Sequence, residues 1–269
     1  MTVRLYHFIF SILLIAVIFG CATTGPGGKQ SVILIPTETE VSLGREMAQQ
    51  VRAEYEMLPD SLWQEYINEI GQRIVAVSDR KDIEYNFAVI KSDEINAFAA
   101  PGGYIYFYTG LLEMMENEAE LAAVMAHEIS HVVARHSVKR LQAAMGASIL
   151  YDLVMGENQS QALDIAVNLG MGMVFSGYSR SAEKEADEYG IIYMVEAGYN
   201  PGASKTMFQK LAQASSGEQN FFEQLFASHP ETQERISNIE SQIARMQPLS
   251  SSLVYNRDRY QRMKTRIQN

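Results

Sequence analysis

The sequence is poor in cysteine and in long apolar runs. Its single cysteine, Cys21, excludes a disulfide within the chain. A helix that spans a bilayer needs about 20 consecutive apolar residues. The apolar stretches at 141–150 and 165–175 are shorter, and acidic residues lie between them. We therefore predict buried helices in these two stretches and no membrane span.

Positive charge is scarce as well. The chain of 269 residues has 22 lysines and arginines against 32 acidic residues, which gives a net charge of −10. A chain of this charge is a poor partner for nucleic acid, which is itself an anion. Internal repeats are absent from the sequence too, and we expect no helical-repeat module.

The N-terminus has the pattern of a bacterial signal peptide over residues 1–20. A basic start at Arg4 is followed by an apolar stretch at 8–19 and by Gly20. The next residue, Cys21, resembles the lipid-bearing cysteine of a lipoprotein, and Ala22 after it favours the outer membrane of a Gram-negative bacterium. The prediction is a periplasm-facing, lipid-anchored protein. The alternative is an ordinary secretory peptide that is cleaved nearby.

Composition and periodicity divide the rest of the chain. Residues 21–35 are rich in glycine, threonine and proline and are predicted to form a flexible tether. Residues 36–245 suit one compact domain, with helical patterns at 40–56 and 61–77 and strand patterns at 83–90 and 104–108. Residues 246–269 form a basic tail, which we expect to be a solvated helix.

The most informative motif is His-Glu-x-x-His at residues 127–131, inside a run that reads as a helix. Positions i and i+4 of a helix lie on one face, so His127 and His131 can bind one metal ion. Glu128 lies at the edge of that face, where it can take a proton from a metal-activated water. The alternative is a solvated helix face, but the apolar residues at 121–126 argue against it.

A catalytic zinc ion needs a third protein ligand, and acidic residues at 183–188 are candidates. Ser179 is a plausible helix cap, and Glu183 and Asp187 follow at i and i+4 of that helix. One carboxylate can bind the metal while the other accepts the N–H of a ligand histidine. The alternative is a charged, solvated start of a helix.

These motifs, together with Asn96-Ala97-Phe98-Ala99-Ala100-Pro101-Gly102-Gly103, resemble the HtpX, Oma and BepA family of zinc metallopeptidases over roughly residues 36–245. The resemblance implies an α+β, mainly helical gluzincin domain whose active-site helix packs against a small sheet. It also implies an endopeptidase with one Zn²⁺ per chain. The resemblance implies that His127, His131 and Glu183 bind the zinc. It implies that Glu128 is the general base and that Asp187 is a carboxylate that orients a ligand.

The strand region is predicted to bind the substrate. An extended peptide can add to an exposed sheet edge through main-chain hydrogen bonds. The residues assigned to this role are Asn96, Ala97, Phe98, Ala99, Gly103 and Tyr104. The alternative is that these strands only pack on the active-site helix.

His229 precedes a proline and, from the sequence alone, is most simply a loop or cap residue. The resemblance implies that it approaches the zinc. There it either occupies the position of the water or helps to bind the oxyanion.

The predicted function is zinc-dependent hydrolysis of peptide bonds in proteins. The resemblance suggests misfolded or misassembled cell-envelope proteins as substrates, with the membrane as a partner through the lipid and envelope assembly proteins as further partners. An alternative is an outer-membrane assembly or chaperone lipoprotein whose peptidase activity is held off by His229. A third reading, a lipoprotein with a purely structural zinc, leaves Glu128 without a role.

Overall fold

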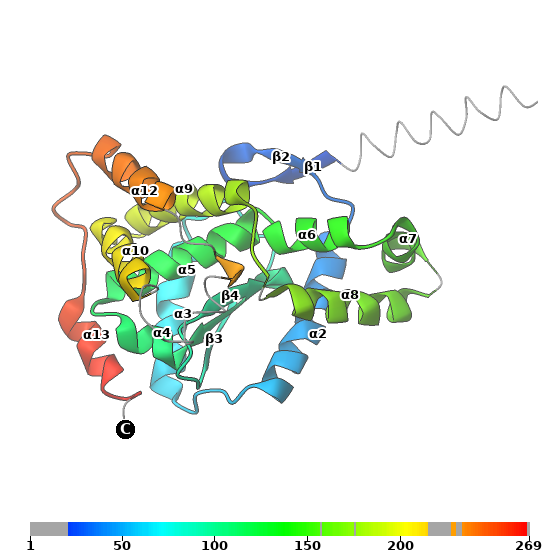
Figure 1. Ribbon diagram of the computed structural model, residues 1–269, viewed down its shortest axis with the longest axis horizontal. Coiled ribbons are helices and arrows are strands. Elements are labelled where there is room, and N and C mark those ends of the chain that lie inside the picture. Colours follow the sequence, from blue (N-terminus) through cyan, green and yellow to red (C-terminus); the bar gives the residue numbers. More distant parts are fainter. Residues whose placement is uncertain (1–20, 157, 175, 215–226, 230–232, 268–269) are drawn as a thin grey trace, which may run out of the picture.

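The computed structural model describes residues 21–156, 158–174, 176–214, 227–229 and 233–267, so the predicted signal segment lies outside the described residues (Figure 1). Its helices are α2 (Thr37–Glu54), α3 (Ser61–Val75), α4 (Thr109–Met114), α5 (Glu118–Val133), α6 (His136–Ala144), α7 (Ala147–Met155), α8 (Gln159–Val174), α9 (Arg180–Glu196), α10 (Gly202–Ala214), α12 (Gln233–Arg245) and α13 (Arg257–Lys264). Its strands are β1 (Cys21–Thr24), β2 (Gln30–Val32), β3 (Asn86–Ile90), β4 (Ala97–Ala100) and β5 (Tyr104–Tyr108), with short 3₁₀ turns η1 (Pro26–Gly28) and η2 (Pro101–Gly103).

The larger sheet has the strand order β3-β5-β4. The central strand β5 runs parallel to β3 and antiparallel to β4, so β4 is an edge strand. β4 returns into β5 through η2, where Gly102 and Gly103 have φ of 73° and 88°. Glycine adopts this left-handed region without steric cost, which explains the two glycines in the turn.

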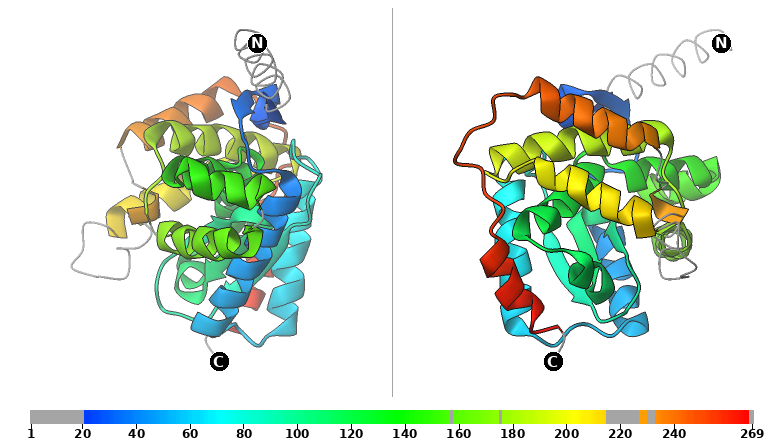
Figure 2. Two further views of the ribbon diagram at one scale, coloured as in Figure 1. Left: turned by 90° about the vertical axis from the view of Figure 1, so that its right-hand side faces the viewer. Right: turned by 60° about the vertical axis from the view of Figure 1, so that its left-hand side comes forward.

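Helices cover both faces of the sheet. Successive side chains of a strand point to opposite faces. On β5, Ile105 and Phe107 belong to the cluster that contains side chains of α3 and α5. Tyr106 and Tyr108 belong to a second cluster, together with Val51 of α2 and neighbours from α8. In the right-hand view of Figure 2, the strands lie between α3 in cyan and α2 in blue.

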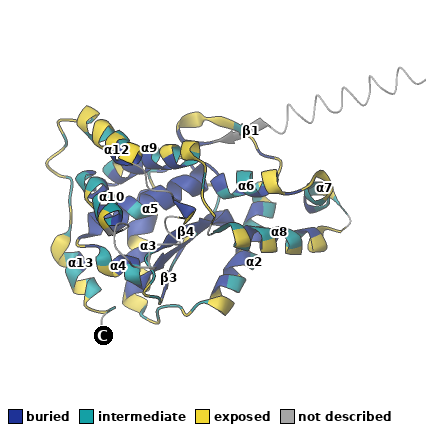
Figure 3. Cartoon of the chain, viewed as in Figure 1, coloured by how far each residue is buried: buried dark blue, intermediate teal, exposed yellow. Residues whose placement is uncertain are grey.

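Helix α5 carries the His-Glu-x-x-His motif through the middle of the domain. Asn117 caps it, since its side chain accepts a hydrogen bond from the backbone N–H of Glu120 at 3.0 Å. Nearly every residue of the helix is buried, as the dark blue ribbon in Figure 3 shows. The predicted fold class is confirmed: a mainly helical α+β domain whose motif helix packs against a small sheet.

The apolar stretch at 141–150 and the described part of the stretch at 165–175 fall within α6 to α8, which are buried on one face only. Leu153 and Ala166 are buried, whereas Tyr151 and Met155 are largely exposed. Among the residues described, no helix is both long and apolar enough to cross a membrane.

The segment predicted as a flexible tether, residues 21–35, contains paired strands instead. β1 and β2 are antiparallel, and the backbone N–H of Gly27 donates to Asp79 Oδ2 at 3.0 Å. Beyond β2, Ile33 and Ile35 are buried in a cluster with side chains of α2, α6 and α8. Composition describes the stiffness of an isolated chain, whereas this segment finds apolar partners on the domain.

The C-terminal segment 246–269 also differs from the predicted solvated helix. Tyr260 of α13 is buried and donates its hydroxyl hydrogen to the carbonyl of Leu112 at 2.6 Å. Trp63 of α3 donates its ring N–H to the carbonyl of Met263 at 2.9 Å. The basic side chains of this segment led to the prediction of a solvated helix. The buried ring of Tyr260 instead holds α13 against α3 and α4.

Candidate metal centre

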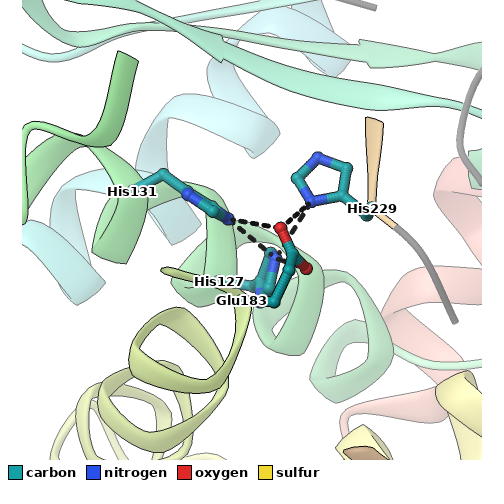
Figure 4. Close-up of side chains that lie close together, drawn as sticks. All are labelled: His127, His131, Glu183 and His229. Carbon is teal, nitrogen blue, oxygen red and sulfur yellow. Dashed lines mark hydrogen bonds and ion pairs between the residues drawn. The ribbon is translucent and has the colours of Figure 1, made fainter. Parts of the chain in front are cut away.

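Four side chains from three parts of the chain converge beside α5 (Figure 4). The Nε2 atoms of His127 and His131 are 3.1 Å apart, as expected for i and i+4 on one helix face. Glu183, in the first turn of α9, places its two oxygens 3.6 Å from His127 Nε2 and 3.4 Å from His131 Nε2. His229 completes the group, with Nδ1 3.3 Å from His127 Nε2 and 3.1 Å from Glu183 Oε1.

These separations fit a zinc ion. Nitrogen and oxygen ligands about 2.0–2.1 Å from a tetrahedral zinc lie about 3.3 Å from one another. The five ligand-atom pairs given above span 3.1–3.6 Å. Imidazole nitrogen and carboxylate oxygen are also donors that zinc prefers. His127, His131 and Glu183 would hold the ion, and His229 is the fourth side chain of the cluster.

Helix α9 delivers Glu183 because it lies very close to α5. Ser179 caps α9 by accepting a hydrogen bond from the backbone N–H of Ala182 at 3.3 Å. Farther along α9, a Cβ added at Gly190 would lie 3.1 Å from the backbone nitrogen of His127. The absence of a side chain at Gly190 therefore permits the approach of the two helices.

Asp187 lies where the sequence predicts it, one turn beyond Glu183. Its Oδ1 is 3.0 Å from His127 Nδ1, the ring nitrogen that points away from the cluster. Arg235 of α12 binds Asp187 through two hydrogen bonds of 2.8 and 2.7 Å and contacts Glu183 Oε2 at 2.8 Å. Arg235 and Asp187 are 48 residues apart, so the sequence carries no signal of this contact.

Glu128 is buried next to the cluster but is not part of it. Its Oε1 is 3.5 Å from His229 Nε2, the nitrogen of that ring that faces away from Glu183. His229 thus lies between Glu128 and the other three side chains of the cluster. A water or a substrate carbonyl would need this same space.

Charges and burial set the protonation of the cluster. Burial favours a neutral Glu183, but the nearby His229 and His131 outweigh it and hold the pKa of Glu183 well below its usual value. Burial likewise opposes a charge on His229, yet Glu183 and Glu128 raise its pKa. For His131, burial dominates and lowers the pKa well below its usual value. A neutral imidazole and an ionised carboxylate are the forms that bind zinc.

Two further side chains, Tyr178 and His136, lie against the ring of His131. Tyr178 stacks on its ring at 4.0 Å between centroids, and burial raises the pKa of Tyr178 to about 12. His136 contacts His131 Nδ1. Arg135 has a φ of 54°, which separates α5 from α6, so helical spacing could not predict this contact.

The predicted substrate residues occupy different positions around the sheet. Asn96 directly precedes β4, Ala97–Ala99 lie in the edge strand, and Gly103 lies in η2. Tyr104 starts the central strand and is paired on both sides, with Asn86 and with Ala100. The edge strand reaches the cluster through Ser137, whose hydroxyl contacts both the carbonyl of Ala99 at 3.3 Å and the hydroxyl of Tyr178 at 2.8 Å.

A buried histidine pair, a helix-borne carboxylate and a glutamate within reach of the same space form the kind of centre found in metallopeptidases. Comparison with known proteins agrees. The chain matches the model of Peptidase family M48 over residues 61–243. It is 33% identical over 177 residues to the mitochondrial metalloendopeptidase OMA1 of Schizosaccharomyces pombe, which covers 65% of this chain and 51% of that protein.

Two bacterial relatives are similar as well. The beta-barrel assembly-enhancing protease of Yersinia pestis is 30% identical over 232 residues, 82% of this chain and 47% of that protein. The metalloprotease LoiP of Escherichia coli is 34% identical over 167 residues, 59% of this chain and 63% of that protein. The chain belongs to peptidase family M48, so the resemblance seen in the motifs is confirmed. It spans about half the length of the first two of these relatives.

Proposed function

We propose that this protein is a zinc-dependent endopeptidase that cleaves unfolded or misassembled proteins of the cell envelope. The observation that carries the proposal is the convergence of His127, His131 and Glu183 at ligand spacing, with Glu128 buried beside them. A relative named for enhancing beta-barrel assembly supports an envelope substrate.

The residues divide the chemical work. His127, His131 and Glu183 would hold a zinc ion, which would supply a Lewis acid for the scissile carbonyl and lower the pKa of water. Glu128 accepts the proton of the attacking water and afterwards donates it to the leaving amine nitrogen. Asp187 accepts the Nδ1–H of His127, which keeps Nε2 free to bind and fixes the orientation of the ring.

The substrate would bind along β4 as an additional strand. β4 is the edge strand of its sheet: its residues are buried by helices, and among the described residues no other strand pairs with its outer side. Ala97 to Ala99 would supply main-chain hydrogen bonds, with Asn96 directly before the strand and Gly103 in the turn that follows it. Ser137 and Tyr178 connect this edge to the ring of His131.

The sequence of the N-terminus supports a location at the cell envelope. A signal peptide at 1–20 followed by a lipid on Cys21 would place the domain at 36–245 on the periplasmic side of the outer membrane. The strand β1 begins at Cys21 and is paired with β2, so a lipid there would hold the domain close to the bilayer. Envelope proteins would then be the substrates within reach.

The proposal is tested by the relation between bound zinc and proteolysis. We expect one zinc per chain, and we expect the rate of cleavage of an unfolded casein-like substrate to rise in proportion to bound zinc when the chelated protein is reloaded. Trypsin in the same chelator buffer controls for changes in the substrate. Cleavage at the full rate by protein that holds no metal would contradict the proposal.

A second candidate function, an envelope assembly lipoprotein with a restrained peptidase, is favoured by the position of His229. We expect His229→Ala to raise the basal cleavage rate by about 10- to 100-fold, because a hydrogen bond to a charged group such as Glu183 contributes about 1.5–3 kcal/mol to the closed arrangement. The assay is cleavage per bound zinc, with the exposed Gln233→Ala as control. A loss of activity of about 100-fold or more would instead assign His229 to binding of the oxyanion.

A further inference from the structure

A second chain of contacts starts at His131, on the side that faces away from the cluster. His131 Nδ1 lies 2.9 Å from Nδ1 of His136, the first residue of α6. His136 Nε2 lies 3.2 Å from Glu185 Oε2 on α9. Glu185 Oε1 in turn lies 3.0 Å from the ammonium group of Lys29, which directly follows η1. None of the three is assigned a part in the metal centre above.

The donor and acceptor roles along this chain are fixed by the metal side of His131. Its Nε2 points at His127 and Glu183, so a zinc ligand there leaves the ring proton on Nδ1. His136 Nδ1 must therefore accept a hydrogen bond from His131 Nδ1–H. The ring proton of His136 is then on its Nε2. From Nε2 it donates to Glu185, and a carboxylate accepts from both His136 and Lys29. Each nitrogen and oxygen in this chain then has a matching donor or acceptor. No other placement of the protons satisfies the same contacts while Nε2 of His131 carries no proton.

The two ligand histidines are therefore supported in different ways. His127 is held directly by the carboxylate of Asp187 at 3.0 Å. Nδ1 of His131 instead contacts the neutral ring of His136. The carboxylate in this chain, that of Glu185, contacts the far nitrogen of His136. His136 is buried and Glu185 is half-buried, so solvent screens these contacts only partly. Lys29 is exposed, and an ion pair of that kind contributes little.

We propose that His136 and Glu185 are positioning residues for His131, which fix its tautomer and the orientation of its ring and so strengthen zinc binding. The inference rests on the metal centre of the proposed function. Partners of this kind at ligand histidines typically change metal affinity by about 10- to 100-fold. Two substitutions at His136 separate hydrogen bonding from packing. Phenylalanine keeps a ring but no acceptor, whereas glutamine keeps an acceptor for His131 and a donor for Glu185.

The experiment measures zinc affinity by competition with a chromophoric chelator, and the melting temperature of each metal-free protein. We expect His136→Phe to weaken zinc binding by about 10- to 100-fold, and His136→Gln to recover most of the loss. Glu185→Gln should weaken binding by a smaller factor, because the amide oxygen still accepts but without charge. Glu188→Gln, an exposed position on the same helix, is the matched control and should bind zinc as the parent does.

Each outcome is decisive. If the parent binds one zinc and His136→Phe binds it equally well, the inference is overturned while the proposed function stands. If the phenylalanine and glutamine variants lose affinity equally and the melting temperatures fall together, His136 serves packing only and the inference is again overturned. If the parent itself binds no zinc, the proposed function fails first and the inference falls with it.

Discussion

A Glu128→Gln protein should retain its zinc and lose cleavage activity by about 10²- to 10⁴-fold, the usual contribution of a general acid–base group. Glutamine has nearly the shape of glutamate, so the buried site keeps its packing. Glu128 is 2% exposed and lies outside the ligand cluster, which predicts unchanged metal content. The amide cannot accept the proton of an attacking water, and this single deficiency accounts for the expected loss.

The measurement pairs zinc content with cleavage of an unfolded substrate in the same sample. The background should be His229→Ala, so that closure by His229 does not mask the rate. Glu113→Gln, an exposed position before the same helix, is the control for the loss of one carboxylate. If zinc-loaded Glu128→Gln in the His229→Ala background cleaves as fast as His229→Ala alone, Glu128 is not the base.

The buried carboxylate of Glu40 is expected to make a large contribution to stability. Glu40 of α2 is buried between two arginines, with 2.9 Å to each of two Arg80 nitrogens and 2.7 Å to Arg135 Nε. It also accepts a hydrogen bond from the backbone N–H of Gly102 at 3.3 Å. A glutamine at position 40 would leave two buried guanidinium groups without their common counterion. We expect Glu40→Gln to lower the free energy of unfolding by about 3–5 kcal/mol, the cost of breaking a buried ion pair from one side.

Urea denaturation of the metal-free protein measures this effect without a contribution from zinc binding. Glu38→Gln is the matched control, because Glu38 is exposed and also lies in the first turn of α2. It should change stability by no more than about 0.5 kcal/mol. Equal stability of the Glu40 and Glu38 variants would show that the buried arginines find other partners.

The sequence predicts those parts of the centre that helix geometry dictates. His127 and His131, and likewise Glu183 and Asp187, are pairs at i and i+4, and their common direction follows from a helix of any surroundings. The resemblance to known metallopeptidases assigns the two pairs to one centre. The structure brings them to ligand spacing and places His229 between Glu128 and the other three side chains of the cluster.

The parts that escaped prediction depend on tertiary packing. Arg135 and Glu40 are far apart in sequence, as are His136 and Glu185, and no local pattern signals such contacts. The N-terminal segment and the C-terminal helix look polar and loose in composition, yet Ile35 and Tyr260 are buried in the domain. Local propensity is a weak guide wherever a few apolar side chains find a partner surface.

Anomalous diffraction at the zinc edge, from crystals of zinc-loaded protein that cleaves an unfolded substrate, is the most direct test of the metal centre. We expect one strong peak about 2.0–2.2 Å from His127 Nε2, His131 Nε2 and a Glu183 oxygen. A fully occupied zinc elsewhere in the active protein, with these three side chains unliganded, would contradict the assignment.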